Sequence, residues 1–103
     1  LFGFGIMIYA EDSAHLSLLA VSPTARRQGV GTALLQWLEQ VAQVAGIARV
    51  QLEARHDNAS ALAFYRRHGY AQTDTVPGMY LGVADGVRLE KMLVQEPAAA
   101  RRP

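Results

Sequence analysis

Residues 21–35 of the chain read VSPTARRQGVGTALL, and this stretch governs the interpretation of the whole sequence. An apolar run stops at Ser22-Pro23, two arginines follow, and Gly29 and Gly31 precede a segment with helical periodicity. The stretch therefore predicts a loop that leads into the N-terminus of a helix. The first N–H groups of a helix have no partner inside it and the helix dipole is positive there, so this position suits an anion such as a diphosphate.

Length and composition are those of an ordinary folded domain. The chain has 103 residues, of which 50% are hydrophobic and 18% are charged, and its net charge of +1 gives no reason to expect a nucleic-acid or membrane partner. We predict one domain over residues 1–96 and a disordered tail over residues 97–103. The chain contains no cysteine, which excludes disulfides, thiolate catalysis and zinc–thiolate sites, and we expect no metal.

The start of the sequence resembles neither a membrane span nor a secretion leader. No apolar run approaches the ~20 residues that cross a bilayer, and the opening LFGFGIMIY lacks the basic region and cleavage site of a signal peptide. We therefore expect a cytoplasmic protein. Because Leu1 is not an initiator methionine and residues 1–9 already read as a strand, we also expect that an upstream portion is missing from this sequence.

Periodicity and turn residues divide the chain into seven elements. Strands are predicted over Phe2–Tyr9, His15–Val21, Ile47–Ala54, Tyr70–Thr75 and Val87–Val94, and helices over Gly31–Gly46 and Ala59–His68. Turns are assigned to residues 10–13, to Pro77-Gly78 and to Asp85-Gly86. The order β-β-α-β-α-β-β belongs to the α/β (α+β) class with a mixed sheet.

The first helix has the clearest periodicity in the chain. Its predicted core face consists of Val30, Leu34, Trp37, Leu38, Val41 and Ala45, and its predicted solvent face of Gln36, Glu39, Gln40 and Gln43. Gly46 is expected to end this helix, and Asn58 is expected to cap the N-terminus of the second.

Two common phosphate-binding loops do not fit the glycine pair. A P-loop requires a lysine directly after its last glycine, and the only lysine of the chain is Lys91. A dinucleotide-binding loop requires a third glycine at the position of Leu34, although Glu53 lies at a passable distance for its acidic residue.

A third interpretation fits two separate motifs. The pattern V-x-P-x-x-R-R-x-G-x-G over residues 21–31 resembles motif A of the GNAT family of N-acetyltransferases. The pattern N-x-x-A-x-x-x-Y-x-x-x-G-Y from Asn58 to Tyr70 looks like the family's motif B, and Leu89–Leu93 is similar to its last strand. The resemblance covers roughly residues 1–94 and implies a mixed, mostly antiparallel sheet flanked by helices. It also implies that acetyl-CoA is the cosubstrate.

The chain departs from the family pattern at its beginning. A typical member has a strand, two helices and a further strand before the first hairpin, and no counterpart of these elements is present here. Because those elements form much of the groove for the acceptor, the sequence leaves the acceptor unassigned.

The resemblance also implies where acetyl-CoA binds. Leu19, Ala20 and Val21 end a strand that splays from its neighbour, so their backbone is expected to polarise the thioester carbonyl and to pair with the pantetheine. The pyrophosphate is expected on the amides of Arg27, Gln28, Gly29, Val30, Gly31 and Thr32, where the glycines allow close approach. The side chain of Arg26 or Arg27 either pairs with the phosphates or is solvated. Asn58 is expected both to cap its helix and to contact the cofactor.

Three residues are candidates for proton transfer. Tyr65 lies seven positions after Asn58 on the same helix face, and the resemblance makes it the general acid for the leaving thiolate; the alternative is a core tyrosine. His15 occupies a position where many members carry a glutamate base, and is equally well interpreted as a half-exposed strand histidine. Glu53 is the second candidate base, or else an ion-pair partner of Arg55 or of another surface base.

We therefore expect an acetyl-CoA-dependent N-acetyltransferase. It would transfer acetyl to a primary amine of a small molecule or a peptide, by direct attack in a ternary complex. The alternative is a noncatalytic acetyl-CoA-binding module that acts as a sensor or as a subunit of a larger assembly. The apolar first strand, if uncovered, would favour pairing with a second chain, so a homodimer is a further expectation.

Overall fold

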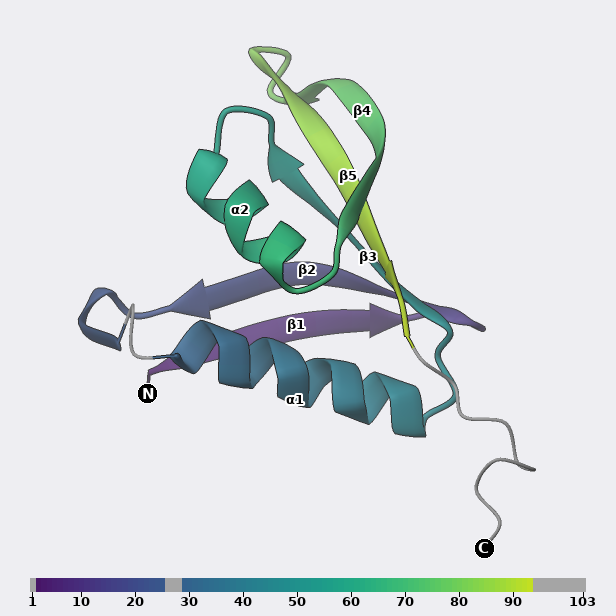
Figure 1. The fold of residues 1–103 in the computed structure, drawn as a ribbon. Coiled ribbons are helices and arrows are strands. Elements are labelled where there is room, and N and C mark those ends of the chain that lie inside the picture. Colours follow the sequence, from purple (N-terminus) through teal and green to yellow (C-terminus); the bar gives the residue numbers. More distant parts are fainter. Residues whose placement is uncertain (1, 26–28, 94–103) are drawn as a thin grey trace, which may run out of the picture.

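The computed structural model describes residues 2–25 and 29–93, which contain one five-stranded sheet and two α-helices. The elements are β1 (Gly3–Tyr9), β2 (Ser13–Val21), the 3-10 turn η1 (Pro23–Ala25), α1 (Val30–Val44), β3 (Arg49–Arg55), α2 (Ala59–Arg67), β4 (Ala71–Tyr80) and β5 (Ala84–Met92) (Figure 1). The predicted order is confirmed, with η1 as an addition. The tail predicted over residues 97–103 lies outside the described residues.

The sheet has the strand order β1-β2-β3-β5-β4. Of its four neighbouring pairs, β2 and β3 are parallel and the other three are antiparallel, so the mixed, mostly antiparallel class is confirmed. A parallel pair needs a long crossover, and α1 supplies it between β2 and β3. Neither helix in the described ranges is long and apolar enough to cross a membrane.

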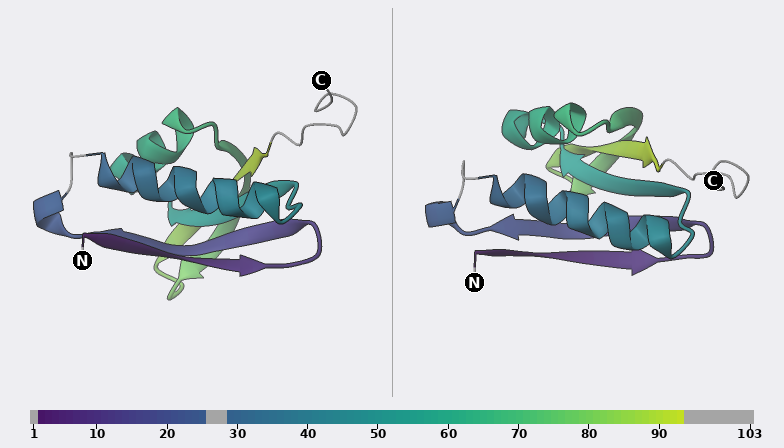
Figure 2. Two further views of the ribbon diagram at one scale, coloured as in Figure 1. Left: turned by 90° about the horizontal axis from the view of Figure 1, so that it is seen from below. Right: turned by 60° about the horizontal axis from the view of Figure 1, so that its bottom comes forward.

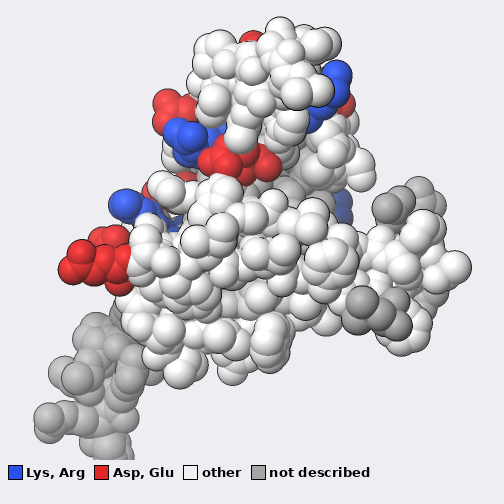
Figure 3. All heavy atoms as spheres, turned by 180° about the vertical axis from the view of Figure 1, so that it is seen from behind, with Lys and Arg blue, Asp and Glu red and all other residues white. Residues whose placement is uncertain are grey.

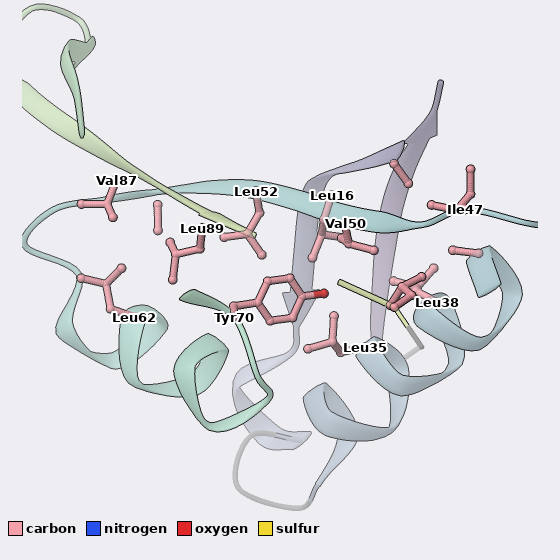
Figure 4. Packing of buried hydrophobic residues seen from close by; sticks show 14 residues of the cluster. Leu16, Leu35, Leu38, Ile47, Val50, Leu52, Leu62, Tyr70, Val87 and Leu89 are labelled. Atoms are coloured by element: carbon pink, nitrogen blue, oxygen red, sulfur yellow. The ribbon is translucent and has the colours of Figure 1, made fainter. Parts of the chain in front are cut away.

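Both helices cover the same face of the sheet (Figure 2). The core lies between them and the strands, and its largest fully buried side chains are those of Leu35, Val50, Leu52 and Leu89. Tyr70 follows α2 directly and stands within this cluster, with its hydroxyl pointing toward α1 (Figure 4). The Tyr70 ring therefore fixes where the end of α2 lies relative to α1.

The buried face of α1 is rotated from the predicted one. Leu35, Leu38 and Ala42 are buried, whereas Trp37 is 59% exposed and Val41 is 41% exposed. Ala45, also predicted on the core face, is exposed as well. The period was predicted correctly, but its phase was wrong for these three residues. Apolar residues occur on so much of this helix that several phases fit the sequence, and only packing against the sheet decides among them.

Glu39 was predicted on the solvent face of α1, and this prediction is wrong. Its side chain is buried, with the residue only 9% exposed. Its Oε2 accepts a hydrogen bond from the Tyr70 hydroxyl at 2.8 Å, and its Oε1 pairs with Nζ of Lys91 at 2.9 Å. A buried charge requires such partners, and these come from parts of the sequence that periodicity cannot relate to α1.

The last hairpin turns at other residues than predicted. β4 continues through Pro77-Gly78 to Tyr80, and Asp85-Gly86 lies inside β5, so neither predicted turn is present; the chain turns at residues 81–83. The ladder between β4 and β5 is irregular where it passes Pro77-Gly78. The N–H of Gly78 donates to Oδ1 of Asp85 at 2.9 Å, which holds this segment against β5.

Candidate functional site

An extra residue at Ser17 bends β2. One step along β1, from Ile6 to Met7, corresponds to two steps along β2, from Leu18 to Leu16. Such a bulge bends the strand, and the side chains after it lie on the opposite face from the one that regular alternation would give them. Nothing in the sequence around Ser17 predicted it.

Immediately before this bulge, β2 leaves its parallel neighbour β3. Only Ser13–His15 pair with residues 49–51, and the two strands then diverge (Figure 1). Leu19 and Ala20, near the end of β2, are in register with β1 but with no residue of β3. This edge of β2 therefore faces a gap that an extended molecule with amide groups could occupy in the manner of an added strand.

A groove of about 1010 Å³ opens where the end of β2 meets α1 and α2. Its lining comes from these three elements: Leu19, Ala20, Val21, Gly29, Gly31, Thr32, Asn58, Ser60, Ala61, Ala63, Phe64, Tyr65 and Arg67. Eight residues of the predicted cofactor set are among them, although they come from three separate parts of the sequence. Val30 begins α1 beside the groove without lining it. Arg26, Arg27 and Gln28 lie outside the described residues.

The N-terminus of α1 opens on this groove. Its N-cap is Gly29, in the left-handed conformation (φ 76°), and no described side chain caps the first turn. The first turn also contains no acidic residue, so no carboxylate of that turn competes for its N–H groups. A Cβ at Gly29 would meet no atom of the described residues within 4 Å, so among these residues it is the positive φ that requires glycine.

Asn58 and Tyr65 reach the groove from α2. The Oδ1 of Asn58 accepts a hydrogen bond from the N–H of Ala61 at 3.1 Å, which confirms the predicted N-cap. The half-buried ring of Tyr65 packs edge-on against Phe64 and Tyr70, with centroids 5.2 and 5.6 Å away. Burial raises the pKa of the Tyr65 hydroxyl above its ordinary value of 10.0, so this hydroxyl keeps its proton at neutral pH.

His15 and Glu53 are joined where β2 and β3 diverge. The Nε2 of His15 lies 2.5 Å from Oε1 of Glu53, and Nε of Arg88 donates to Oε2 at 3.0 Å. Burial by itself raises the pKa of Glu53, but the hydrogen bonds and positive charges of His15 and Arg88 outweigh burial and hold this pKa below its ordinary value. Arg55 pairs with Asp57 instead, so a Glu53–Arg55 ion pair is wrong, whereas the predicted alternative of an ion pair with another base is present, with Arg88.

The sequence did not reveal two members of this cluster. Arg88 stands directly opposite Glu53 in the antiparallel ladder of β3 and β5, so only the strand register could have identified the pair. Ser17 hydrogen-bonds to Nδ1 of His15 at 3.1 Å because the bulge places it there. In the described ranges, no three His, Cys, Asp or Glu side chains are grouped as a metal site would require.

A model of the acetyltransferase (GNAT) family matches residues 2–70, about two thirds of the chain. This chain belongs to the acetyltransferase (GNAT) family. The match includes the glycine pair before α1 and the whole of α2, which are the two segments that meet at the groove. The family resemblance noted in the sequence is therefore confirmed.

Curated relatives in the family are longer than this chain. The ribosomal protein bS18-alanine N-acetyltransferase of Escherichia coli (strain K12) is 37% identical over 83 residues, which cover 81% of this chain and 55% of the relative. An uncharacterized protein of Bacillus subtilis (strain 168) is 35% identical over 66 residues, covering 64% of this chain and 41% of the relative. The chain thus spans about half the length of the curated relatives it matches.

Solved structures of GNAT acetyltransferases share this fold. The ribosomal-protein-S18-alanine N-acetyltransferase from Escherichia coli superimposes with a TM-score of 0.84 at 30% identity, over 93% of this chain and 64% of that protein. Ard1 from Thermoplasma volcanium gives a TM-score of 0.86 at 28% identity, over 91% and 64%. Naa20 of Chaetomium thermophilum, solved with a bisubstrate analogue, gives 0.78 at 27%, over 88% and 58%.

Proposed function

We propose that this chain is the acetyl-CoA-binding and catalytic part of an N-acetyltransferase whose acceptor is a primary amine of a peptide or small molecule. The observation that carries the proposal is the groove. It extends from the divergent end of β2 to the N-terminus of α1, and the hydroxyl-bearing ring of Tyr65 forms part of its wall.

The two ends of the groove suit the two halves of CoA. The edge of β2 at Leu19 and Ala20 can hydrogen-bond to the amides of pantetheine, as a neighbouring strand would. The N–H groups of the first turn of α1 suit the diphosphate, as do Gly29 and Gly31, which add no side chain there. Acetyl-CoA, when bound, supplies the thioester carbonyl that the amine attacks, and backbone N–H groups at the end of β2 polarise this carbonyl.

His15 is the base in this proposal, and Glu53 orients it. A carboxylate only accepts, so the proton of the neutral imidazole lies on Nε2, which faces Glu53. Nδ1 then holds the lone pair, beside the hydroxyl of Ser17. Nδ1 takes the proton from the ammonium group of the acceptor, directly or through Ser17, and the Glu53 carboxylate stabilises the resulting imidazolium. The lowered pKa of Glu53 keeps it ionised for this role.

Tyr65 is the acid in this proposal. A leaving thiolate needs a proton donor, and a hydroxyl whose pKa is raised by burial is protonated at neutral pH. The nitrogen that attacks the thioester loses a second proton as the C–S bond breaks and the amide forms, and this proton restores the Tyr65 hydroxyl. Within the described residues no hydrogen bond occupies the Tyr65 hydroxyl, although the ring is held by Phe64 and Tyr70.

A peptide with a free N-terminal amine is the first acceptor to test. The support comes from the Escherichia coli relative, whose name states that it acetylates an alanine of a ribosomal protein. Because the chain contains no cysteine, a thiol reagent measures released CoA without background from the protein.

The test uses the full chain, acetyl-CoA and three kinds of acceptor. These are peptides with a free alanine N-terminus, the same peptides with blocked N-termini and a lysine, and small primary amines. We expect saturable CoA release with at least one free-amine acceptor. Stabilisation by CoA without turnover on any acceptor would instead favour the noncatalytic binding module.

We further propose that β1 pairs with a second copy of the chain. β1 is an end strand of the described sheet, and Phe2, Phe4, Ile6 and Ile8 are each between 44% and 68% exposed. Figure 3 shows the adjoining face as a largely uncharged surface. Light scattering should give twice the chain mass, and Ile6→Lys should give a monomer because a lysine blocks strand pairing. The matched control is Val44→Lys, on the exposed face of α1. A monomeric wild type would contradict the dimer.

A further inference from the structure

A side-chain hydrogen bond joins the two helices beside the groove. Oγ1 of Thr32, in the first turn of α1, lies 3.1 Å from Nε2 of His68, the C-cap residue of α2. Thr32 lines the groove, whereas His68 does not. The two residues are 36 positions apart in sequence, and nothing in the sequence pattern relates them.

The position of the His68 ring is fixed from two sides. Its backbone N–H donates to the carbonyl oxygen of Tyr65, and the N–H of Gly69 donates to that of Arg66, which closes the last turn of α2. Its imidazole packs edge-on against the ring of Phe64, with centroids 4.7 Å apart. Phe64 in turn lines the groove. The Thr32 hydroxyl therefore meets an imidazole that is held in place.

This hydrogen bond determines what the Thr32 hydroxyl can offer to a ligand. A hydroxyl has one proton and two acceptor lone pairs, so it donates one hydrogen bond. If Nε2 of His68 holds a lone pair, the Thr32 proton is directed at His68. If Nε2 carries a proton, it donates to Oγ1, and the Thr32 proton is available to the groove. Only the second arrangement gives an anion in the groove a further donor.

We propose that His68 is a positioning residue for the diphosphate of CoA. It donates from Nε2 to Oγ1 of Thr32 and thereby directs the Thr32 hydroxyl to a phosphate oxygen at the N-terminus of α1. The inference rests on the proposed function, because that function supplies the diphosphate. His68 itself does not touch the ligand, so its contribution passes through Thr32.

A double-mutant cycle tests this dependence, because it isolates the coupling between two residues. Dissociation constants for CoA are measured with the full chain for wild type, Thr32→Val, His68→Leu and the double variant. We expect each single substitution to weaken binding about tenfold, the size typical of one hydrogen bond to a charged group. The double variant should bind no more weakly than Thr32→Val alone.

Two more variants separate positioning from general stability. His68→Gln keeps an N–H donor near the place of Nε2 and should restore most of the affinity lost in His68→Leu. His56→Leu changes an exposed histidine at the other end of α2 and should leave the affinity unchanged. Pantetheine, which lacks the diphosphate, should bind equally to wild type and to His68→Leu. The melting temperature of each ligand-free variant shows whether it is folded.

Three results would overturn the inference. The first is a CoA affinity that His68→Leu leaves unchanged, or that a folded His68→Gln variant fails to restore. The second is full additivity in the cycle, which would mean that His68 does not act through Thr32. The third is an equal loss of pantetheine binding, which would indicate a general distortion of the groove. A wild-type chain that binds no CoA at all would overturn the proposed function and this inference with it.

Discussion

The imidazole of His15 and the carboxylate of Glu53 meet 2.5 Å apart, beside the last residue pair of the β2–β3 ladder. A side-chain hydrogen bond thus continues across the gap where the backbone hydrogen bonds stop. The same contact holds the two strands together at the beginning of the gap and aligns the candidate base.

Replacing His15 by glutamine should slow acetyl transfer. The glutamine amide would keep a hydrogen-bonding side chain at this position but could not accept a proton at neutral pH. We therefore expect kcat to fall roughly 10²- to 10⁴-fold with little change in the KM for acetyl-CoA. Steady-state kinetics with the best acceptor measure this. The control is His56→Gln, a substitution at an exposed histidine outside the groove. An unchanged kcat in His15→Gln would remove His15 from the mechanism.

The ion pairs of Glu53 should make stability depend on pH in acid. The pKa of Glu53 is lower in the folded protein than its ordinary value of 4.5. The contribution of ionised Glu53 to the free energy of unfolding is therefore fully present above pH 4.5. It is lost as the pH falls through the pKa of Glu53 in the folded protein. Glu53→Gln should lower the melting temperature at pH 7, and the difference from wild type should shrink below pH 4.5. A difference that stays constant across this range would show that the charge of Glu53 contributes nothing.

Replacing Tyr65 by phenylalanine tests the proposed acid. The ring contacts with Phe64 and Tyr70 remain while the hydroxyl is lost, so we expect kcat to fall roughly ten- to a thousandfold and CoA affinity to stay nearly constant. Spectrophotometric titration should also lose a tyrosine that ionises above pH 10. Tyr9→Phe, at a residue that is 43% exposed, is the matched control. If Tyr65→Phe turns over as fast as wild type, Tyr65 is only a packing residue.

Two substitutions at Gly29 distinguish backbone conformation from ligand approach. Alanine at φ 76° should cost about 1–2 kcal/mol of stability, whereas asparagine tolerates the left-handed region better. The described residues leave space for a Cβ there. If the diphosphate lies against Gly29, both variants should bind CoA at least tenfold more weakly, while Gly29→Asn melts close to wild type. Wild-type CoA affinity in Gly29→Asn would mean that the ligand does not approach this residue.

The buried Glu39 should be important for stability and not for turnover. Glu39→Ala leaves the Tyr70 hydroxyl and the Lys91 ammonium group without their partner, which should cost about 2 kcal/mol in urea unfolding. Glu11→Ala, at an exposed carboxylate, should cost almost nothing. Equal stability of the two variants would show that the Glu39 network is energetically neutral.

Local patterns in the sequence were sufficient for much of the fold. Helical periodicity, the cap at Asn58, and two motifs of fixed spacing each depend on residues close together in the chain. The order of the elements and eight groove residues followed from them. The roles of these residues in binding and catalysis remain predictions.

Other features depend on contacts between distant segments. The bulge at Ser17 is defined only by the register with β1, and the Glu53–Arg88 pair only by the register with β5. Glu39 is buried because Tyr70 and Lys91 reach it across the core. The pair Asp85-Gly86 has a strong turn preference, yet the ladder with β4 places it within a strand. For Asp85-Gly86, tertiary pairing overrode the local preference.

The three-pair ladder between β2 and β3 divides the sheet into two units, one built on β1 and β2 and the other on β3, β5 and β4. Few backbone hydrogen bonds cross this junction, and the shared hydrophobic core holds the two units together. A molecule lying along the junction would stand where a fully paired sheet has another stretch of ladder. If acetyl-CoA binds along this junction, the bound donor would bridge the two units of the sheet. Its release in each catalytic cycle would remove that bridge and leave the units joined only by the short ladder and the core.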